Sequence, residues 1–231
     1  MKGEIIMALN KNIITQVINF CNRDLVPDEQ FKTGSAYPIE WFNDYFSFLG
    51  NSNLQKYLGE AYYQARFMYK LMNGLRLPIA KHKAIVRFQI IQYASICEAV
   101  LQAAIESFFK SEFEDKYAVI QLTKCHNALS SSTKITYDNK TVYLCKEKRI
   151  KADIKRERID HKTDFAVQHN IISANTKKEF DSLYQSRNNI HILKAAQNNY
   201  TPKLKEAKEA FALMQTFISE VKNFYSSQTI V

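Results

Sequence analysis

Three polar residues in the last third of the chain have the types and spacing that phosphodiester chemistry uses. Arg187, Asn188 and His191 lie within one five-residue stretch. Histidine has an unperturbed pKa near neutrality, so it can move a proton at a hydroxyl group. The planar guanidinium group of arginine binds two phosphate oxygens at once. The trio is therefore a candidate site for RNA cleavage without a metal, in which His191 moves the proton, Arg187 holds the phosphate and Asn188 orients either group.

The spacing also places the arginine and the histidine on the apolar face of a predicted helix. Thr176 and Glu179 have the spacing of a capping box, and the helix that they open is expected to reach about Leu193. The shared face consists of Phe180, Leu183, Tyr184, Arg187, Ile190 and His191. A polar group on such a face needs a partner in the protein, in a second subunit or in a pocket, because a dry unpaired polar group costs about 1 to 3 kcal/mol.

Glu98 is the predicted partner for this cluster. The segment from Ile79 to about Phe109 repeats apolar residues at three- and four-residue steps, which predicts the central helix of the core. Glu98 lies on the same apolar stripe, where an unpaired carboxylate is costly to bury. We therefore expect it within salt-bridge reach of Arg187 or of another cation. A structural role for the cluster stays open, with Arg187 paired to Glu98 and His191 in contact with the core.

A second candidate contact surface for RNA is the basic segment from Lys146 to Arg158. It holds seven basic residues and three acidic ones. The residues considered for RNA contacts are Lys148, Arg149, Lys151, Lys155, Arg156 and Arg158. Such a run is also typical of a solvated surface. The formal net charge of +9 fits a polyanionic partner and fits equally a basic protein without one.

The composition favours an all-α fold. Hydrophobic residues make up 46% of the 231 residues, which is enough for a core, and five glycines and four prolines leave little material for turns. We expect an N-terminal helical extension over residues 1–75 and a helical bundle over residues 76–231. Residues 133–144 have a β-rich pattern around Asp138 and Asn139, which predicts a β-hairpin inserted near residues 130–146.

Apolar spacing, capping residues and a proline predict the remaining helices. The predicted N-terminal helices are Ile13–Cys21, Ile39–Leu49 and Leu54–Met72. Ser52 and Gln55 have capping-box spacing at the start of the third of these helices. Thr201 and Pro202 then predict the start of a final helix that reaches about Tyr225.

Several classes of site are not expected from this sequence. Cys21, Cys97, Cys125 and Cys145 lie far apart, and no C-x-x-C pair or suitably spaced histidine joins them, so neither a metal site nor a disulfide framework is predicted. The sequence has no G-x-x-x-x-G-K loop, which excludes P-loop chemistry, and no cofactor is expected. Neither a secretory signal nor an apolar stretch of membrane-spanning length is recognised, so we expect a cytoplasmic protein without membrane contact.

The stretch from Phe165 to Ile192 resembles the third-helix region of HEPN domains, which are helical bundles found in prokaryotic toxins and antiviral ribonucleases. The run Tyr93–Leu101 resembles an early helix of that bundle, and the helix after Thr201 resembles its closing one. The signature of the family is an arginine, often followed by a polar residue such as asparagine, and a histidine after four to six further residues. Arg187, Asn188 and His191 match it with only three intervening residues.

The resemblance covers roughly residues 80–226 and implies a metal-independent endoribonuclease with a role in toxin–antitoxin systems or antiviral defence. It also implies a homodimer in which Arg187 and His191 of two subunits face a shared cleft, together with an antitoxin or another protein partner. Two alternatives stay open. One is a non-catalytic HEPN-like bundle that binds RNA, a nucleotide or a protein, and the other is a dimerisation module.

Overall fold

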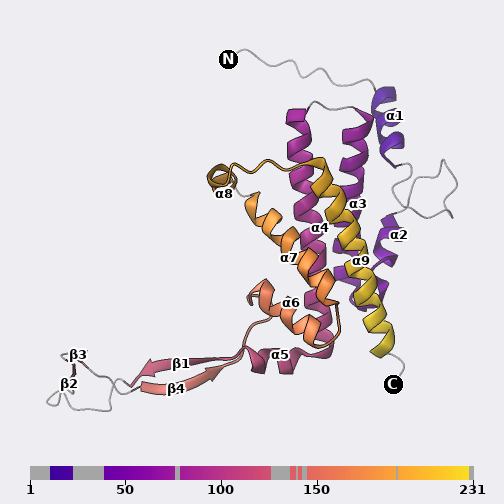
Figure 1. The fold of residues 1–231 in the computed structure, drawn as a ribbon. Coiled ribbons are helices and arrows are strands. Elements are labelled where there is room, and N and C mark those ends of the chain that lie inside the picture. The colour runs from indigo at the N-terminus through magenta and orange to yellow at the C-terminus, as the bar shows by residue number, and fades with distance from the viewer. Residues whose placement is uncertain are drawn as a thin grey trace.

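The computed structural model describes residues 11–22, 39–75, 79–125, 136–138, 140–141, 145–190 and 192–228. These residues form a mostly helical bundle with an inserted pair of antiparallel strands, which confirms the predicted fold class (Figure 1). The helices are α1 (Lys11–Asn22), α2 (Ile39–Asp44), η1 (Ser47–Leu49), α3 (Ser52–Gly74), α4 (Ile79–Phe108), α5 (Lys110–Lys116), α6 (Ile159–Gln168), α7 (Ala174–Asn189), α8 (Ile192–Gln197) and α9 (Leu204–Gln228).

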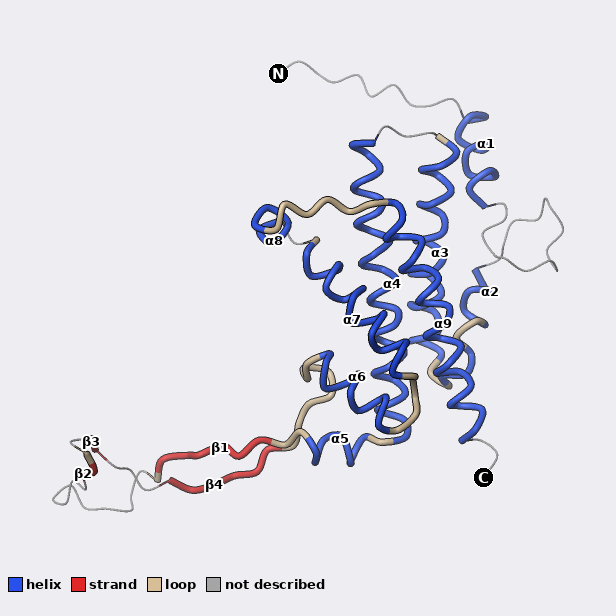
Figure 2. Tube along the Cα trace, in the orientation of Figure 1, coloured by secondary structure: helices blue, strands red, loops and turns tan. Residues whose placement is uncertain are grey.

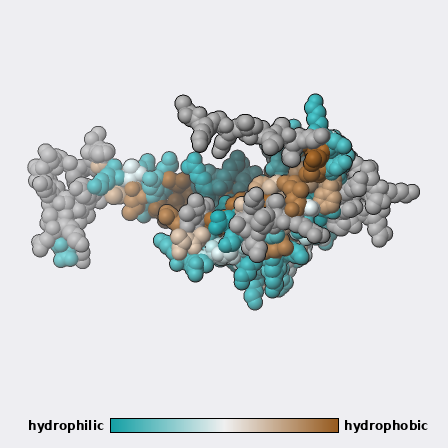
Figure 3. Space-filling view, turned by 90° about the horizontal axis from the view of Figure 1, so that it is seen from above, coloured by the Kyte–Doolittle hydropathy of each residue, from teal (hydrophilic) through white to brown (hydrophobic). Residues whose placement is uncertain are grey.

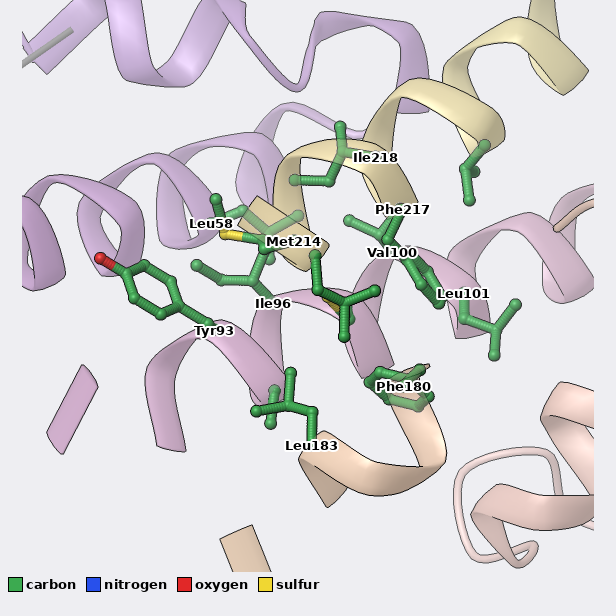
Figure 4. Packing of buried hydrophobic residues seen from close by; sticks show 14 of the residues in the cluster. Leu58, Tyr93, Ile96, Val100, Leu101, Phe180, Leu183, Met214, Phe217 and Ile218 are labelled. Carbon is green, nitrogen blue, oxygen red and sulfur yellow. The ribbon is translucent and has the colours of Figure 1, made fainter. Parts of the chain in front are cut away.

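Helix α4 is the centre of the bundle. It contacts α3, α6, α7 and α9 and follows the predicted bounds closely. Its apolar stripe is buried because these neighbours cover it on several sides (Figure 4). Within the described residues, α4 is also long and apolar enough to cross a membrane by length and composition, and about half of its most apolar stretch is buried inside the bundle.

Aromatic side chains join α2 and α3 to the same core. The ring of Phe42 meets that of Tyr62 edge-on at 5.2 Å, and Tyr62 in turn lies 6.2 Å from Phe211 of α9. Edge-to-face contacts of this kind add to the hydrophobic contribution of each ring. Residues 39–75 thus share one hydrophobic cluster with α4 and α9, while the division of the chain at residue 75 stays a prediction.

The start of α3 differs from the predicted capping box. Asn51 is the N-cap, and its side chain accepts a hydrogen bond from the amide of Leu54 at 3.0 Å. Gln55 donates its side-chain amide to the carbonyl of Ser47 at 3.2 Å instead of reaching back to a cap at Ser52. Asparagine is one of the best N-cap residues, so Asn51 competes effectively with the neighbouring serine.

The insertion is longer than the predicted hairpin. Strands β1 (Val119–Lys124) and β4 (Cys145–Ile150) pair antiparallel along their whole length, and they form a ribbon that projects from the α5 end of the bundle (Figure 2). The short strands β2 (Thr136–Tyr137) and β3 (Lys140–Thr141) pair around Asp138, whose φ of 49° fits the predicted tight turn. The sequence missed β4 because four consecutive charged residues gave it the pattern of a solvated surface.

Candidate functional site

Helix α7 carries the candidate site, and its N-terminus is held by a network of hydrogen bonds. Ser173 is the N-cap and accepts from the amide of Thr176 at 3.1 Å, so the predicted cap at Thr176 is wrong. Glu220 of α9 accepts from the amide of Ser173 at 2.8 Å, from its hydroxyl at 2.9 Å and from the hydroxyl of Thr176 at 2.7 Å. A carboxylate at this position also complements the positive end of the helix dipole.

The C-terminal end of α7 comes earlier than the sequence predicted. The helix ends at Asn189, Ile190 follows it, and α8 begins at Ile192. Two consecutive asparagines in the last turn are poor helix formers, because their side chains compete for backbone hydrogen bonds. His191 lies outside the described residues, so its place beside Arg187 stays a prediction.

Arg187 lies where its helical spacing placed it, next to Tyr184. Its guanidinium group donates a hydrogen bond to the Tyr184 hydroxyl at 3.0 Å, and its Cζ atom lies 4.9 Å from the centre of the tyrosine ring. Both side chains are half-buried. Burial raises the pKa of the Tyr184 phenol, and the negative charge of Glu98 adds to this effect while Arg187 opposes it. Tyr184 therefore stays a neutral hydroxyl that orients the arginine.

An open groove runs beside this pair, between α6 and α7. It has a volume of about 480 Å³, and Tyr184 and Asn188 line one wall while Arg158 and Ile159 line the other. Asn188 is half-buried, and its side-chain amide forms no hydrogen bond within the described ranges. The groove thus brings the second residue of the predicted trio to a surface that a ligand can reach.

Glu98 lies near this cluster without the predicted ion pair. The carboxylate is half-buried on α4 and has no hydrogen bond or ion pair in the part of the chain that the structure describes. The predicted pair with Arg187 is therefore not formed there, because the guanidinium group is bound to Tyr184 instead. The negative charge of Glu98 adds to the raised pKa of Tyr184 and partly opposes the lowering of the pKa of Lys162 by burial.

Lys162 is a buried charged residue that the sequence analysis did not identify. Only 1% of its surface is exposed, and its ammonium group donates to the side-chain carbonyl of Gln102 at 3.4 Å. Burial lowers the pKa of Lys162, against the opposing charges of Glu98 and Glu106. A signal was present, since Lys162 precedes the buried residues Phe165 and Ala166 by three and four positions and so shares their inward face.

The six basic residues predicted to contact RNA divide into bound and unbound groups. Four of them already have protein partners: Arg149 and Lys151 bind Asp115, Arg156 binds Asp153, and Arg158 binds Asp160. The side chains of Lys148 and Lys155 have no hydrogen bond or ion pair to any described residue. The ammonium groups of these two lysines are therefore the ones in the set that are available to bind a phosphate.

The part of the chain that is described has no group of three His, Cys, Asp or Glu side chains that could hold a metal ion. His161 contacts Glu157 at 2.8 Å and His169 contacts Glu112 at 3.1 Å, which are isolated pairs. No family model, no curated protein and no solved structure matches the chain. The chemistry of the cluster on α7 is therefore the main guide to function.

Proposed function

We propose that the protein is a metal-independent endoribonuclease of HEPN type. The observation that carries the proposal is the hydrogen bond from Arg187 to Tyr184 near the end of α7, because Tyr184 and Asn188, the residue after Arg187, line an open groove. His191 follows after three residues. In this proposal Arg187 binds the scissile phosphate, Asn188 orients the phosphate or the histidine, and His191 moves the proton.

The reaction needs no group beyond these residues and the RNA. The 2′-oxygen of the ribose attacks the adjacent phosphorus, and the bond from phosphorus to the 5′-oxygen of the next nucleotide breaks. His191 takes the proton from the 2′-hydroxyl, and the protonated His191 of the partner subunit gives a proton to the leaving 5′-oxygen. Arg187 stabilises the charge that develops on the phosphate oxygens. The products are a 2′,3′-cyclic phosphate and a free 5′-hydroxyl.

The surroundings of Arg187 support a prearranged site. Tyr184 fixes the guanidinium group by a hydrogen bond and by its ring, which lowers the ordering cost of binding a phosphate. Glu98 places a negative charge near this pair from α4. The unbound cations Lys148 and Lys155 offer further phosphate contacts along the chain.

We extend the proposal to biological context through the family that the sequence resembles. A ribonuclease of this type fits a role in a toxin–antitoxin system or in antiviral defence, as a homodimer whose two clusters of Arg187 and His191 face one cleft. An antitoxin or another protein would then cover or reshape that cleft. A symmetric partner also offers a setting for polar groups on an otherwise apolar helical face.

Incubation of the purified full chain with RNA in excess chelator tests the proposal. We expect cleavage by the wild type that leaves 2′,3′-cyclic phosphate ends, and at least about a 100-fold loss of rate for His191→Ala, because the proton carrier is removed. His161→Ala is the matched control, since His161 lies on α6 and contacts Glu157 just before that helix, and it should keep the wild-type rate. Equal cleavage by wild type and His191→Ala would assign the activity to another site or to a contaminant.

A second candidate function has an observation in its favour. Because Arg187 is already bound to Tyr184 and half-buried, its role can be structural, in a bundle that binds RNA, a nucleotide or a protein without cleaving it. RNA binding without cleavage, unchanged by His191→Ala, would support this alternative. Loss of the dimer in Arg187→Ala or His191→Ala would instead support a dimerisation role.

A further inference from the structure

The ribbon formed by β1 and β4 exposes apolar side chains away from the bundle. Val119 is 61% exposed, Ile120 is 67% exposed and Leu122 is 61% exposed. Figure 3 shows hydrophobic atoms along the part of the molecule that projects sideways. Single exposed apolar residues are common on protein surfaces, but Ile120 and Leu122 lie two positions apart on one strand and therefore expose neighbouring apolar side chains on the same face.

The pairing register sorts the side chains of the ribbon onto two faces. Residues that lie directly opposite each other in an antiparallel pair point to the same side. Ile120 lies opposite Arg149, and Leu122 lies opposite Glu147, so the two apolar side chains share one face. Gln121 lies opposite Lys148 on the other face.

The two edges of the ribbon differ in charge. The strand β4 has four charged residues in a row, from Lys146 to Arg149, and charges of this kind protect an edge strand from pairing with another chain. The strand β1 has no charged residue from Val119 to Thr123. Within the described residues, β1 pairs with β4 alone, so its other edge offers unpaired backbone groups.

We propose that this open edge of β1 pairs antiparallel with β1 of a second copy of the chain, around a two-fold axis at Gln121. In this register Gln121 faces its own copy, Ile120 faces Leu122 of the other chain, and Val119 faces Thr123. No like charges oppose each other over these five residues. The neighbouring register centred on Leu122 is less favourable, because it places Ile120 opposite Lys124.

The symmetric pairing joins the two ribbons into a four-stranded sheet. Ile120 and Leu122 of both copies then form one continuous apolar strip on a single face of this sheet. The bundles lie at opposite ends, and the two Val119 residues at the starts of the strands are about 14 Å apart along the strand direction, since four residues separate them and a strand rises about 3.4 Å per residue. A contact of five or six residues buries less than the roughly 1,200 Å² of a stable complex. We therefore expect a weak dimer that dissociates on dilution.

This contact uses a different surface from the cluster on α7, so it does not depend on the proposed ribonuclease function. A variant that abolishes the contact between the β1 strands should leave the cluster on α7 intact, and a variant of that cluster should leave the β1 contact intact. The edge of β1 that forms this contact is also separate from the basic residues considered for RNA, because Lys148 and Arg149 lie on the partner strand β4.

A cysteine placed on the predicted axis tests the register directly. The exposed Cys125 and Cys145 are first replaced by serine in the full chain, while the buried Cys21 and Cys97 stay. Gln121→Cys in this background should form an intermolecular disulfide under mild oxidation. Opposed residues in antiparallel strands have Cα atoms about 4.5 to 5.5 Å apart, which lies within the range of a disulfide. Its rate should exceed that of the control at least about tenfold.

Thr123→Cys is the matched control, because Thr123 lies on the same strand and face but its copy lies four positions away in this register. Addition of Leu122→Lys to Gln121→Cys should abolish the cross-link, since it puts a charge in the apolar strip. Lys148→Glu on β4 should leave the cross-link unchanged. Equal cross-linking of the two cysteine variants, or no cross-linking of Gln121→Cys at any protein concentration, would overturn the proposal.

Discussion

The polar groups at the two ends of α7 differ in their hydrogen bonding. At the N-terminal end, Glu220 accepts three hydrogen bonds from Ser173 and Thr176, so the donors there are satisfied. At the C-terminal end, Glu98 has no hydrogen bond or ion pair to the described residues, and Asn188 has an unbound amide in a groove. Hydrogen bonds therefore hold the N-terminal end of the helix, whereas Glu98 and Asn188 near its C-terminal end have no hydrogen-bond partner among the described residues.

This difference separates polar groups that hold the fold from those that are available to a ligand. A satisfied carboxylate beside a helix N-terminus stabilises the folded state and has no remaining capacity for chemistry. Half-buried groups without partners cost stability, and proteins keep such groups mainly at functional sites. The contrast along α7 supports the proposal that the functional residues lie at its C-terminal end.

Removal of the Glu220 carboxylate should give the largest change in stability. Glu220→Ala leaves three donors without their acceptor, so we expect the free energy of unfolding to fall by about 2 to 3 kcal/mol. Denaturant unfolding measures this loss. Glu209→Ala on the same helix is the control, because its ion pair with Lys205 is exposed and its loss should change stability by less than about 0.5 kcal/mol. Equal losses of unfolding free energy in the two variants would contradict the role of Glu220 in holding the N-terminal end of α7.

Replacement of Lys162 should give a smaller, pH-dependent change. The pKa of Lys162 is lower in the folded protein than in the unfolded chain, so the unfolded state binds more protons between these two values. Wild-type stability should therefore gain with rising pH through that window, relative to Lys162→Met. Near neutral pH the variant should be more stable by about 1 kcal/mol, since it no longer buries an ammonium group whose hydrogen-bond partner, Gln102, is neutral.

Unfolding of both proteins in denaturant, at neutral pH and near pH 10, measures this difference. Lys205→Met is the control, because the Lys205 side chain is 83% exposed and should give the same pH dependence as the wild type. A Lys162→Met protein that is less stable than the wild type at neutral pH would show that the ammonium group is well compensated by its neighbours.

The smallest expected effect is on the acidity of Tyr184. Burial is the main cause of the raised pKa of this phenol, and Glu98→Gln removes the negative charge that adds to it, so the pKa should fall. NMR of the labelled tyrosine ζ-carbon as a function of pH measures the change. Glu106→Gln should leave Tyr184 unchanged while it lowers the pKa of Lys162. No shift in Glu98→Gln would place its carboxylate outside the electrostatic environment of the cluster.

Helical periodicity predicted much of the fold because it reports which face of a helix is buried. It placed α4 almost to the residue, and the β-rich pattern around Asp138 separately located the turn there. It did not resolve competing caps, since Asn51 and Ser173 lie close to residues with similar capping chemistry. It also could not show that a charged run at β4 pairs with β1, because strand pairing depends on a distant segment.

The sequence predicted which residues of the candidate site share a helical face, but it did not predict their hydrogen-bond partners or the burial of Lys162. Spacing placed Arg187 beside Tyr184, and the structure has that contact. The tyrosine, however, takes the place of the expected partner Glu98, because a hydrogen bond to a neighbour on the same helix needs no second element. Lys162 was missed because a lysine between polar neighbours is usually exposed. Only the packing of α6 on α4 shows that it is buried.

The most direct test compares Arg187→Lys with Glu220→Ala in two properties, the RNA cleavage rate per folded molecule and the free energy of unfolding. Arg187→Lys should reduce the rate at least about 100-fold, because an ammonium group cannot bind phosphate oxygens bidentately, and should change stability by no more than about 1 kcal/mol. Glu220→Ala should show the reverse, with a loss of stability and an unchanged rate. A wild-type rate in Arg187→Lys, or an equal loss of rate in Glu220→Ala, would contradict the assignment of function to the C-terminal end of α7.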